Sequence, residues 1–154
     1  MRTQEGRQVY YQANLRCPIF DELKGIATKT FGIGEVLREM LKPYRDRIRL
    51  AFIYGFVASG THTVSSDVDL MIVGNLQLSE IAQGLLDAEA RLGRPVSPTL
   101  FPPSEFQARA AEGHHFVGGV LARPIIFLIG DQHELERILR TKPAKARRKR
   151  TAQA

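Results

Sequence analysis

The sequence is poor in the features that mark secreted and membrane proteins. It has one cysteine, Cys17, and no tryptophan in 154 residues, so no internal disulfide can form. Its longest apolar runs, 70–74 and 125–130, are far shorter than the roughly 18 residues that a membrane span requires, and its start is polar rather than signal-like. We therefore expect a cytoplasmic protein without membrane association.

Acidic residues are missing from the C-terminal end. The chain is 44% hydrophobic and 25% charged, as one globular domain with short appendages would be. Six of its 22 basic residues fall after Arg140, where no acidic residue occurs, so the rest of the chain carries 16 charges of each sign. The sequence predicts a disordered basic tail, 141–154, which either binds nucleic acid through its charge or is only a solvated end.

Strand-like and helix-like segments alternate along the chain. Strands are predicted over 48–55, 68–74, 95–101 and 124–130, with Pro98 indicating an edge strand or a bulge. Helices are predicted over 19–26, 31–44, 78–93, 103–113, 114–123 and 131–140. Ser79 and Asp131 are the expected N-caps, Gly93 the expected C-cap, and Pro43 the end of its helix. This order predicts an α/β fold with a mixed sheet of four or five strands, flanked by helices mainly on one side.

Asp67 and Asp69 open the second predicted strand. Residues i and i+2 of a strand share a face, so the two carboxylates should lie together while Val68 and Leu70 enter the core. Mg²⁺ typically takes one or two protein carboxylates and completes its octahedron with waters and substrate phosphates. The pair therefore predicts a magnesium site, although a strand cap with one solvated charge would produce the same pattern.

A glycine turn and a hydroxyl-rich loop precede the aspartates. Gly55 closes the first strand, and a turn through Gly60 can open a short helix whose free N–H groups face an anion. The loop then supplies hydroxyl donors, from Thr61, Thr63, Ser65 and Ser66. For either glycine alone, simple turn geometry is an equally good reading. His62 is a further candidate for a phosphate contact.

Other phosphate-binding motifs do not fit these residues. A Walker A loop would need Lys and Ser or Thr after Gly60, where Thr61 and His62 stand, and a dinucleotide fingerprint would need three glycines. The order of strand, glycine turn, hydroxyl loop, D-x-D and strand resembles the nucleotidyltransferase domain of the DNA polymerase β superfamily, especially its minimal bacterial members. The resemblance covers residues 48–130.

The resemblance implies two-metal nucleotidyl transfer to a hydroxyl acceptor. By this resemblance, Asp67 and Asp69 are the catalytic residues and hold Mg²⁺, which bridges the phosphates of a nucleoside triphosphate. The same resemblance places the nucleotide beside Gly55, Phe56, Gly60, Thr61, Ser65 and Ser66. Two departures imply binding with weak or lost catalysis: Phe56 replaces the family's serine, and no third carboxylate occurs between Val96 and Phe101, where Ser97 and Thr99 share the relevant face.

The N-terminal segment is similar to a different family. Residues 6–14, "GRQVYYQAN", resemble the last wing strand of winged-helix transcriptional regulators of the ArsR or MarR type, and linker helices would follow. That resemblance implies that the partner strand and the DNA-reading helix lie upstream, in a longer regulator.

The alternative function is therefore a ligand-sensing or dimerisation module of such a regulator. The corresponding division of the chain is a wing-like strand over 1–16, linker helices over 17–46, a nucleotidyltransferase-like domain over 47–140 and the tail over 141–154. The apolar stripe from Ile33 to Leu41 belongs either to the core or to a homodimer interface.

Overall fold

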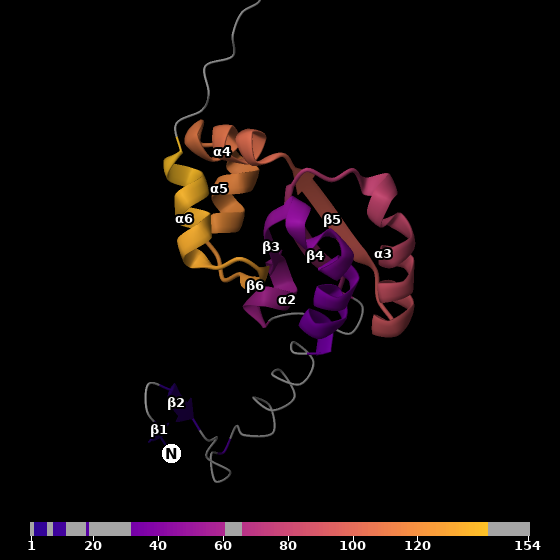
Figure 1. The fold of residues 1–154 in the computed structure, drawn as a ribbon, viewed down its shortest axis with the longest axis vertical. Helices are drawn as coiled ribbons and strands as arrows, with labels where there is room; N and C mark the ends of the chain where they lie inside the picture. Colours follow the sequence, from indigo (N-terminus) through magenta and orange to yellow (C-terminus); the bar gives the residue numbers. More distant parts are fainter. Residues whose placement is uncertain (1, 6–7, 12–17, 19–31, 61–65, 142–154) are drawn as a thin grey trace, which may run out of the picture.

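Four strands form the central sheet of the computed structural model. The structure describes residues 2–5, 8–11, 18, 32–60 and 66–141. The predicted helix over 19–26, the loop residues Thr61 to Ser65 and nearly all of the basic tail lie outside the described residues. The strands of the sheet are β3 (Ile48–Tyr54), β4 (Val68–Gly74), β5 (Val96–Phe101) and β6 (Ile126–Ile129), in the spatial order β5-β4-β3-β6 (Figure 1).

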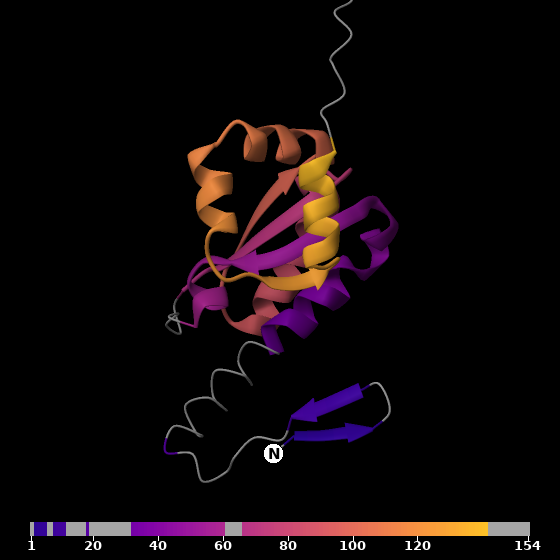
Figure 2. The same ribbon diagram turned by 90° about the vertical axis from the view of Figure 1, so that its left-hand side faces the viewer.

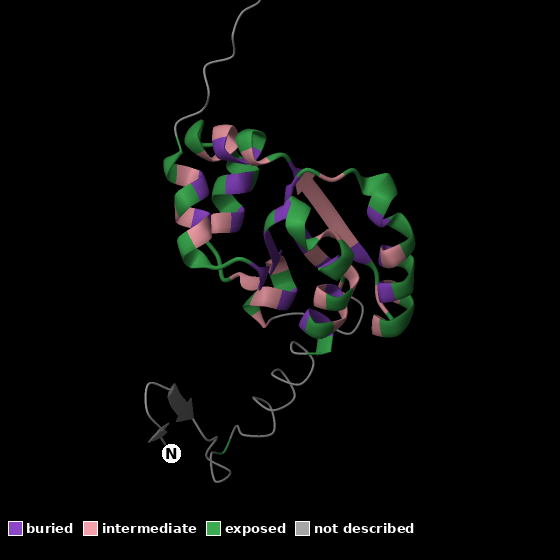
Figure 3. Ribbon diagram, in the orientation of Figure 1, coloured by how far each residue is buried: buried purple, intermediate pink, exposed green. Residues whose placement is uncertain are grey.

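The sheet is mixed, as predicted. β3 runs antiparallel to both β4 and β6, whereas β4 and β5 are parallel. β5 is an edge strand, which explains how it accommodates Pro98, a residue that cannot donate a backbone hydrogen bond. Figure 3 shows β5 as partly exposed along most of its length, while β3 is mostly buried.

Both faces of β3 and β4 are buried, as the unbroken apolar runs of these two segments predict. Because side chains alternate between the faces, Ala51 and Ile53 join one hydrophobic cluster while Leu50 and Phe52 join the other. The same alternation continues on β4, where Leu70 and Ile72 oppose Met71 and Val73. A strand between two apolar layers reads as a continuous hydrophobic run, as these do.

Helices cover both faces of the sheet, so the expectation of helices mainly on one side is wrong. Residues 32–41 form a helix that lies with α3 (Leu78–Leu92) on one face. The other face is covered by α4 (Pro103–Ala111), α5 (His115–Leu121) and α6 (Gln132–Arg140) (Figure 2). The second helix layer forms because the strands are apolar on both faces. Phe52 and Met71 point to this second face, where they pack in one hydrophobic cluster with Phe106, Val117 and Leu135 of the helices.

The helix over residues 32–41 packs within its own chain. Ile33, Leu37 and Leu41 are buried in the cluster that also holds Ile53 and Leu70, so the reading of this stripe as core is confirmed. The α-helix ends at residue 41, and Pro43 lies in the first turn of the 3₁₀ helix η1 (Lys42–Arg47) that follows. No helix among the described residues is long and apolar enough to cross a membrane.

Two of the three expected helix caps are observed. Asp131 accepts a hydrogen bond from the Glu134 N–H at 2.8 Å, and Gly93 ends α3 in the left-handed conformation with φ of 65°. The expected cap at Ser79 is wrong, because the chain enters α3 at Leu78 and Ser79 is already helical. Gln77 is the N-cap, and its N–H donates to the Glu80 carboxylate at 2.9 Å.

The N-terminal strand has a partner within the chain. β1 (Arg2–Glu5) pairs antiparallel with β2 (Gln8–Tyr11), and the two form a sheet of their own. The expectation that the partner of the wing-like strand lies upstream is therefore wrong. The polar segment 2–5 has too little apolar alternation to predict a strand, so its pairing shows only in the structure.

Candidate functional site

Asp67 and Asp69 lie together at the start of β4. Asp67 is exposed and immediately precedes the strand, whereas Asp69 is half-buried within it. Val68 and Leu70, which alternate with them, are fully buried in the opposite layer. The predicted arrangement of two carboxylates on one face is what the strand geometry produces.

Strand register gives Asp69 a neighbour on each side. It pairs with Tyr54 of β3 and with Ser97 of β5. The Ser97 hydroxyl donates to Asp67 Oδ2 at 3.4 Å, so the face of β5 that Ser97 shares with Thr99 is the one beside the aspartates. Three strands thus contribute polar groups to one patch, and the β5 position beside the carboxylates carries a hydroxyl.

Tyr54 belongs to the same patch, although nothing in the sequence predicted it as a site residue. Its hydroxyl forms a hydrogen bond with Thr99 Oγ1, the two oxygens lying 3.4 Å apart. Burial raises the pKa of the Tyr54 phenol, an effect that Thr99 opposes and the charge of Asp69 reinforces. The phenol is therefore neutral at physiological pH and can act as a hydrogen-bond donor.

Gly55 makes room for the Asp69 carboxylate. Its φ of 72° lies in the left-handed region, and a Cβ added there would overlap Asp69 Oδ2. The residue therefore serves the aspartate as well as the turn. Any larger side chain at this position would have to displace the carboxylate or distort the end of β3.

The short helix after β3 begins earlier than the sequence suggested. α2 spans Gly55–Ser59, and Gly60 is its left-handed C-cap, with its N–H hydrogen-bonded to the carbonyls of Phe56 and Val57. A helix opening after Gly60 was expected; instead Gly55 opens it and Gly60 closes it. Phe56 projects from its first turn with 62% of its surface exposed.

The remaining residues predicted to contact the nucleotide lie in or beside the hydroxyl-rich loop that precedes Asp67. Thr61 and Ser65, like His62, lie outside the described residues. Ser66 is partly buried, and its carbonyl accepts a hydrogen bond from Arg94 at 3.4 Å. Arg94 thereby ties the end of the loop to the segment that enters β5.

The ionised form of Asp69 is destabilised by its surroundings. Partial burial is the main cause that raises the pKa of the Asp69 carboxyl, and the negative charge of Asp67 raises it further. A cation between the two carboxylates would remove both penalties. Among the described residues, no group of three or more His, Cys, Asp or Glu side chains could hold a metal ion. The pair fits Mg²⁺, which needs only one or two protein carboxylates.

A pocket of about 290 Å³ adjoins the aspartates through Gly55. Besides Tyr54 and Gly55 it is lined by one stretch of chain, α5 and the turn after it, which contributes His115, Phe116, Gly119, Val120 and Arg123. These residues were not selected from the sequence. The spacing of Phe116, Gly119 and Arg123 at i, i+3 and i+7 within a predicted helix is the signal that could have identified one lining face.

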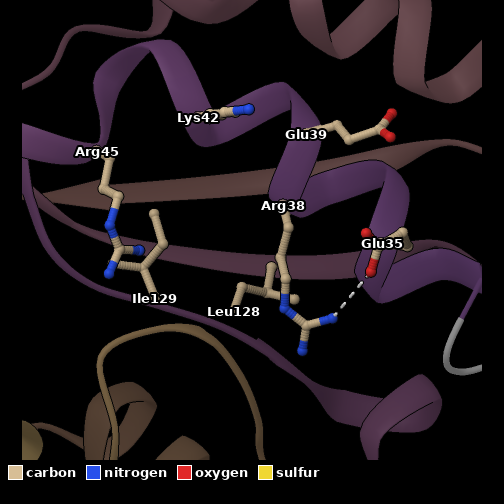
Figure 4. Close-up of a pocket in the computed structure, with 7 residues that line it drawn as sticks. All are labelled: Glu35, Arg38, Glu39, Lys42, Arg45, Leu128 and Ile129. Carbon is tan, nitrogen blue, oxygen red and sulfur yellow. Dashed lines mark ion pairs between the residues drawn. The ribbon is translucent and has the colours of Figure 1, made fainter.

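A second pocket, of about 340 Å³, lies between the helix of residues 32–41, η1 and β6 (Figure 4). Three of its five charged side chains, Glu35, Arg38 and Glu39, have ion-pair partners. Arg38 forms an ion pair with Glu35 at 3.7 Å and donates to the Phe127 carbonyl of β6 at 3.2 Å. Glu39 pairs with Arg91 at 2.7 Å. This pocket is therefore a poorer candidate for ligand binding than the one beside Asp69.

A scan against protein-family models finds no match, and a search of the curated proteins finds no relative of the chain. The case for a function therefore depends on the chemistry of the patch formed by Tyr54, Gly55, Asp67, Asp69 and Ser97.

Proposed function

We propose that the chain binds a magnesium-bound nucleoside triphosphate at Asp67 and Asp69, as a nucleotidyltransferase-like domain whose transfer activity is weak or lost. The observation that carries this proposal is the carboxylate pair itself. Two like charges lie on one face of β4, and Asp69 has a raised pKa because of its burial and its neighbour. Such an arrangement is costly without a cation and favourable with one.

The residues of the patch have complementary tasks in this proposal. Asp67 and Asp69 hold the metal, which supplies charge neutralisation at the phosphate oxygens. Gly55 keeps the space around Asp69 open, and Tyr54 presents a neutral phenol beside it. The hydroxyl group of an acceptor substrate would approach the phosphates from the exposed side of Asp67.

Weak catalysis follows from two residues. Phe56 offers no side-chain donor to a phosphate, and Ser97 occupies the β5 position beside the pair where a carboxylate could act as general base. A hydroxyl of ordinary pKa is a poor base at neutral pH. Loss of general-base catalysis typically costs about 10²- to 10⁴-fold in rate.

The proposal is tested by calorimetric titration of ATP and GTP with and without Mg²⁺. We expect magnesium-dependent binding by the wild type and a loss of about 10- to 100-fold in the Asp69→Asn variant, as is typical for damage to a metal site. Asp87→Asn is the matched control, because Asp87 is an exposed aspartate of α3 whose side chain contacts only Gln83 among the described residues. Binding that ignores Mg²⁺, or that survives in Asp69→Asn, would contradict the proposal.

Restoration of the two missing groups tests the catalytic part. In the double variant Phe56→Ser and Ser97→Asp, we expect release of pyrophosphate from the nucleotide to rise by about 100-fold or more over the wild type, which is the lower end of general-base effects. Ser97→Asn provides the control, since it adds a polar group without a base. Equal rates in all three proteins would mean that the domain is a binding module only.

A second candidate function is a sensing or dimerisation module of a winged-helix regulator. The observation that favours it is the antiparallel pair of β1 and β2, a two-stranded hairpin of the kind that forms a wing. In this reading Mg-nucleotide is a signal rather than a substrate. Sedimentation analysis with and without Mg-nucleotide tests it: a nucleotide-dependent change from monomer to dimer supports sensing, and an unchanged sedimentation coefficient argues against it.

A further inference from the structure

The pocket between α5 and the end of β3 has the residues that a nucleobase requires. Its volume of about 290 Å³ is at the lower end of the range for small-molecule sites. It shares Gly55 with the carboxylate pair, because the same glycine that contacts Asp69 lines the pocket. A ligand that extends from the aspartates into the pocket would therefore pass Gly55.

Phe116 supplies an aromatic surface. It remains 41% exposed, although it packs edge to face against Tyr54 with ring centroids 6.0 Å apart. Tyr54 in turn packs against the buried ring of Phe52, at a centroid distance of 6.3 Å. The exposed ring is thus supported from behind by the core, and a supported aromatic ring is a good stacking platform for a base.

Gly119 leaves space next to that ring. It lies one helical turn after Phe116, and a Cβ added there would meet nothing within 4 Å. A second glycine, Gly118, precedes it, although glycine inside a helix typically costs about 1 kcal/mol relative to alanine. Close packing by the part of the chain that the structure describes does not explain these glycines. A ligand lying against the helix backbone would.

Arg123 closes the pocket with a cation. Among the described residues its side chain has no hydrogen bond and no ion pair. A guanidinium offers five N–H donors and no acceptor, so it matches a base edge that presents acceptors only. Guanine does so with O6 and N7, whereas adenine presents N7 beside an amino donor.

We propose that this pocket binds the guanine base of a guanosine nucleotide, with the ring stacked on Phe116 and Arg123 donating to O6 and N7. The inference rests on the proposed function for the position of the phosphates, which would lie at Asp67 and Asp69. It adds the identity of the base, which the carboxylate pair does not determine.

Binding of GTP and ATP is compared for the full chain and three variants, all in the presence of Mg²⁺. We expect the wild type to prefer GTP by about tenfold, within the range of a bidentate arginine–guanine contact. Arg123→Met should abolish that preference by weakening GTP alone. Phe116→Ala should weaken both nucleotides by roughly tenfold, since every base has a face to stack. Arg140→Met, which removes an exposed arginine of α6, is the control and should change neither affinity.

A titration with guanosine in the absence of Mg²⁺ distinguishes the proposed base pocket from the proposed metal site. If guanosine binds in a manner that depends on Phe116 and Arg123 but Mg²⁺ never strengthens GTP binding, the base pocket is correct and the metal site is not. If Mg-GTP binding is lost in Asp69→Asn but is unaffected by both pocket variants, the metal site is correct and the base pocket is overturned. Equal affinity of the wild type for GTP and ATP would also overturn it.

Discussion

The two faces of the sheet are built from different side chains. In the aliphatic layer, which faces the helix of residues 32–41 and α3, the buried hydrophobic side chains among the described residues are all Ile, Leu, Val or Ala. The aromatic layer, which faces α4, α5 and α6, buries three phenylalanines, Phe52, Phe101 and Phe106. Tyr54, Asp69 and Ser97 lie on strand positions that alternate into the aromatic layer, and Asp67 immediately precedes β4.

In the aromatic layer, the ring contacts of the core continue to the candidate site. Phe127 packs edge to face on Phe52, Phe52 on Tyr54, and Tyr54 on Phe116, with successive centroid distances of 6.2, 6.3 and 6.0 Å. This row of rings runs from the buried sheet to the exposed pocket. Among the described residues, the aliphatic layer contains no such row of rings, so we expect it to support stability alone.

Truncation of a core side chain in each layer should give the largest effects. Phe52→Ala should lower the free energy of unfolding by about 3–5 kcal/mol and Leu37→Ala by about 2–5 kcal/mol, because both residues are fully buried. Chemical denaturation measures both losses. Only Phe52→Ala should also weaken nucleotide binding by the folded protein, since Phe52 supports Tyr54. Equal binding defects in the two variants would remove the functional distinction between the layers.

Gly55→Ala should have an intermediate effect. Its left-handed φ costs an alanine about 1–2 kcal/mol, and the added Cβ would overlap the Asp69 carboxylate. Gly93→Ala is a matched control, because Gly93 has φ of 65° but nothing within 4 Å of the added atom. We expect similar strain in both and an additional loss of stability and Mg²⁺ binding in Gly55→Ala alone. Identical melting temperatures for the two variants would contradict the contact with Asp69.

Asp69 and Glu80 should give pH dependences of opposite sign. The pKa of Asp69 is raised in the fold, so its contribution to stability is full below the unfolded value, about 3.8, and is lost as pH rises through the folded value. Asp69→Asn cannot ionise, so its melting temperature should not show the decline that the wild type shows as pH rises through the folded pKa of Asp69. A wild-type profile without any decline there would contradict the raised pKa.

Glu80, on the side of the aliphatic layer, should have the smallest effect. Its pKa is lowered, first by the hydrogen bond from Arg47 and then by the Gln77 N–H. Its contribution is therefore present above the unfolded value of 4.5 and is lost as pH falls through the folded one. Glu80→Gln should lower the melting temperature slightly at neutral pH and not at all in strong acid. A loss that persists in acid would indicate that packing, not charge, explains the effect.

Local sequence patterns predicted most elements of the sheet and helices. Strand parity placed Asp67 and Asp69 on one face, because alternation along a strand is fixed by the backbone. The position of Ser97 beside them was implied by the family resemblance and depends on the register of β5 on β4. The unbroken apolar runs of β3 and β4 indicated two buried faces, but the helices were expected mainly on one side, and the second helix layer was recognised only in the structure.

Features that depend on contacts between distant segments could not be predicted. The position of Phe116 against Tyr54 results from how α5 docks, which no local pattern specifies. The overlap of Gly55 with Asp69 likewise requires the register of β3 on β4. The cap at Gln77 depends on Glu80, whose carboxylate is also held by Arg47 at 2.8 Å, 33 residues earlier in the chain.

The free edges of the sheet have a consequence for assembly. At β5 the edge contains Pro98, which has no N–H to offer, and at β6 the Phe127 carbonyl is already occupied by Arg38. Neither outer strand presents an uninterrupted row of donors and acceptors to a passing strand. Extension of this four-stranded sheet by a strand from a second copy of the chain is therefore disfavoured at both of its outer strands.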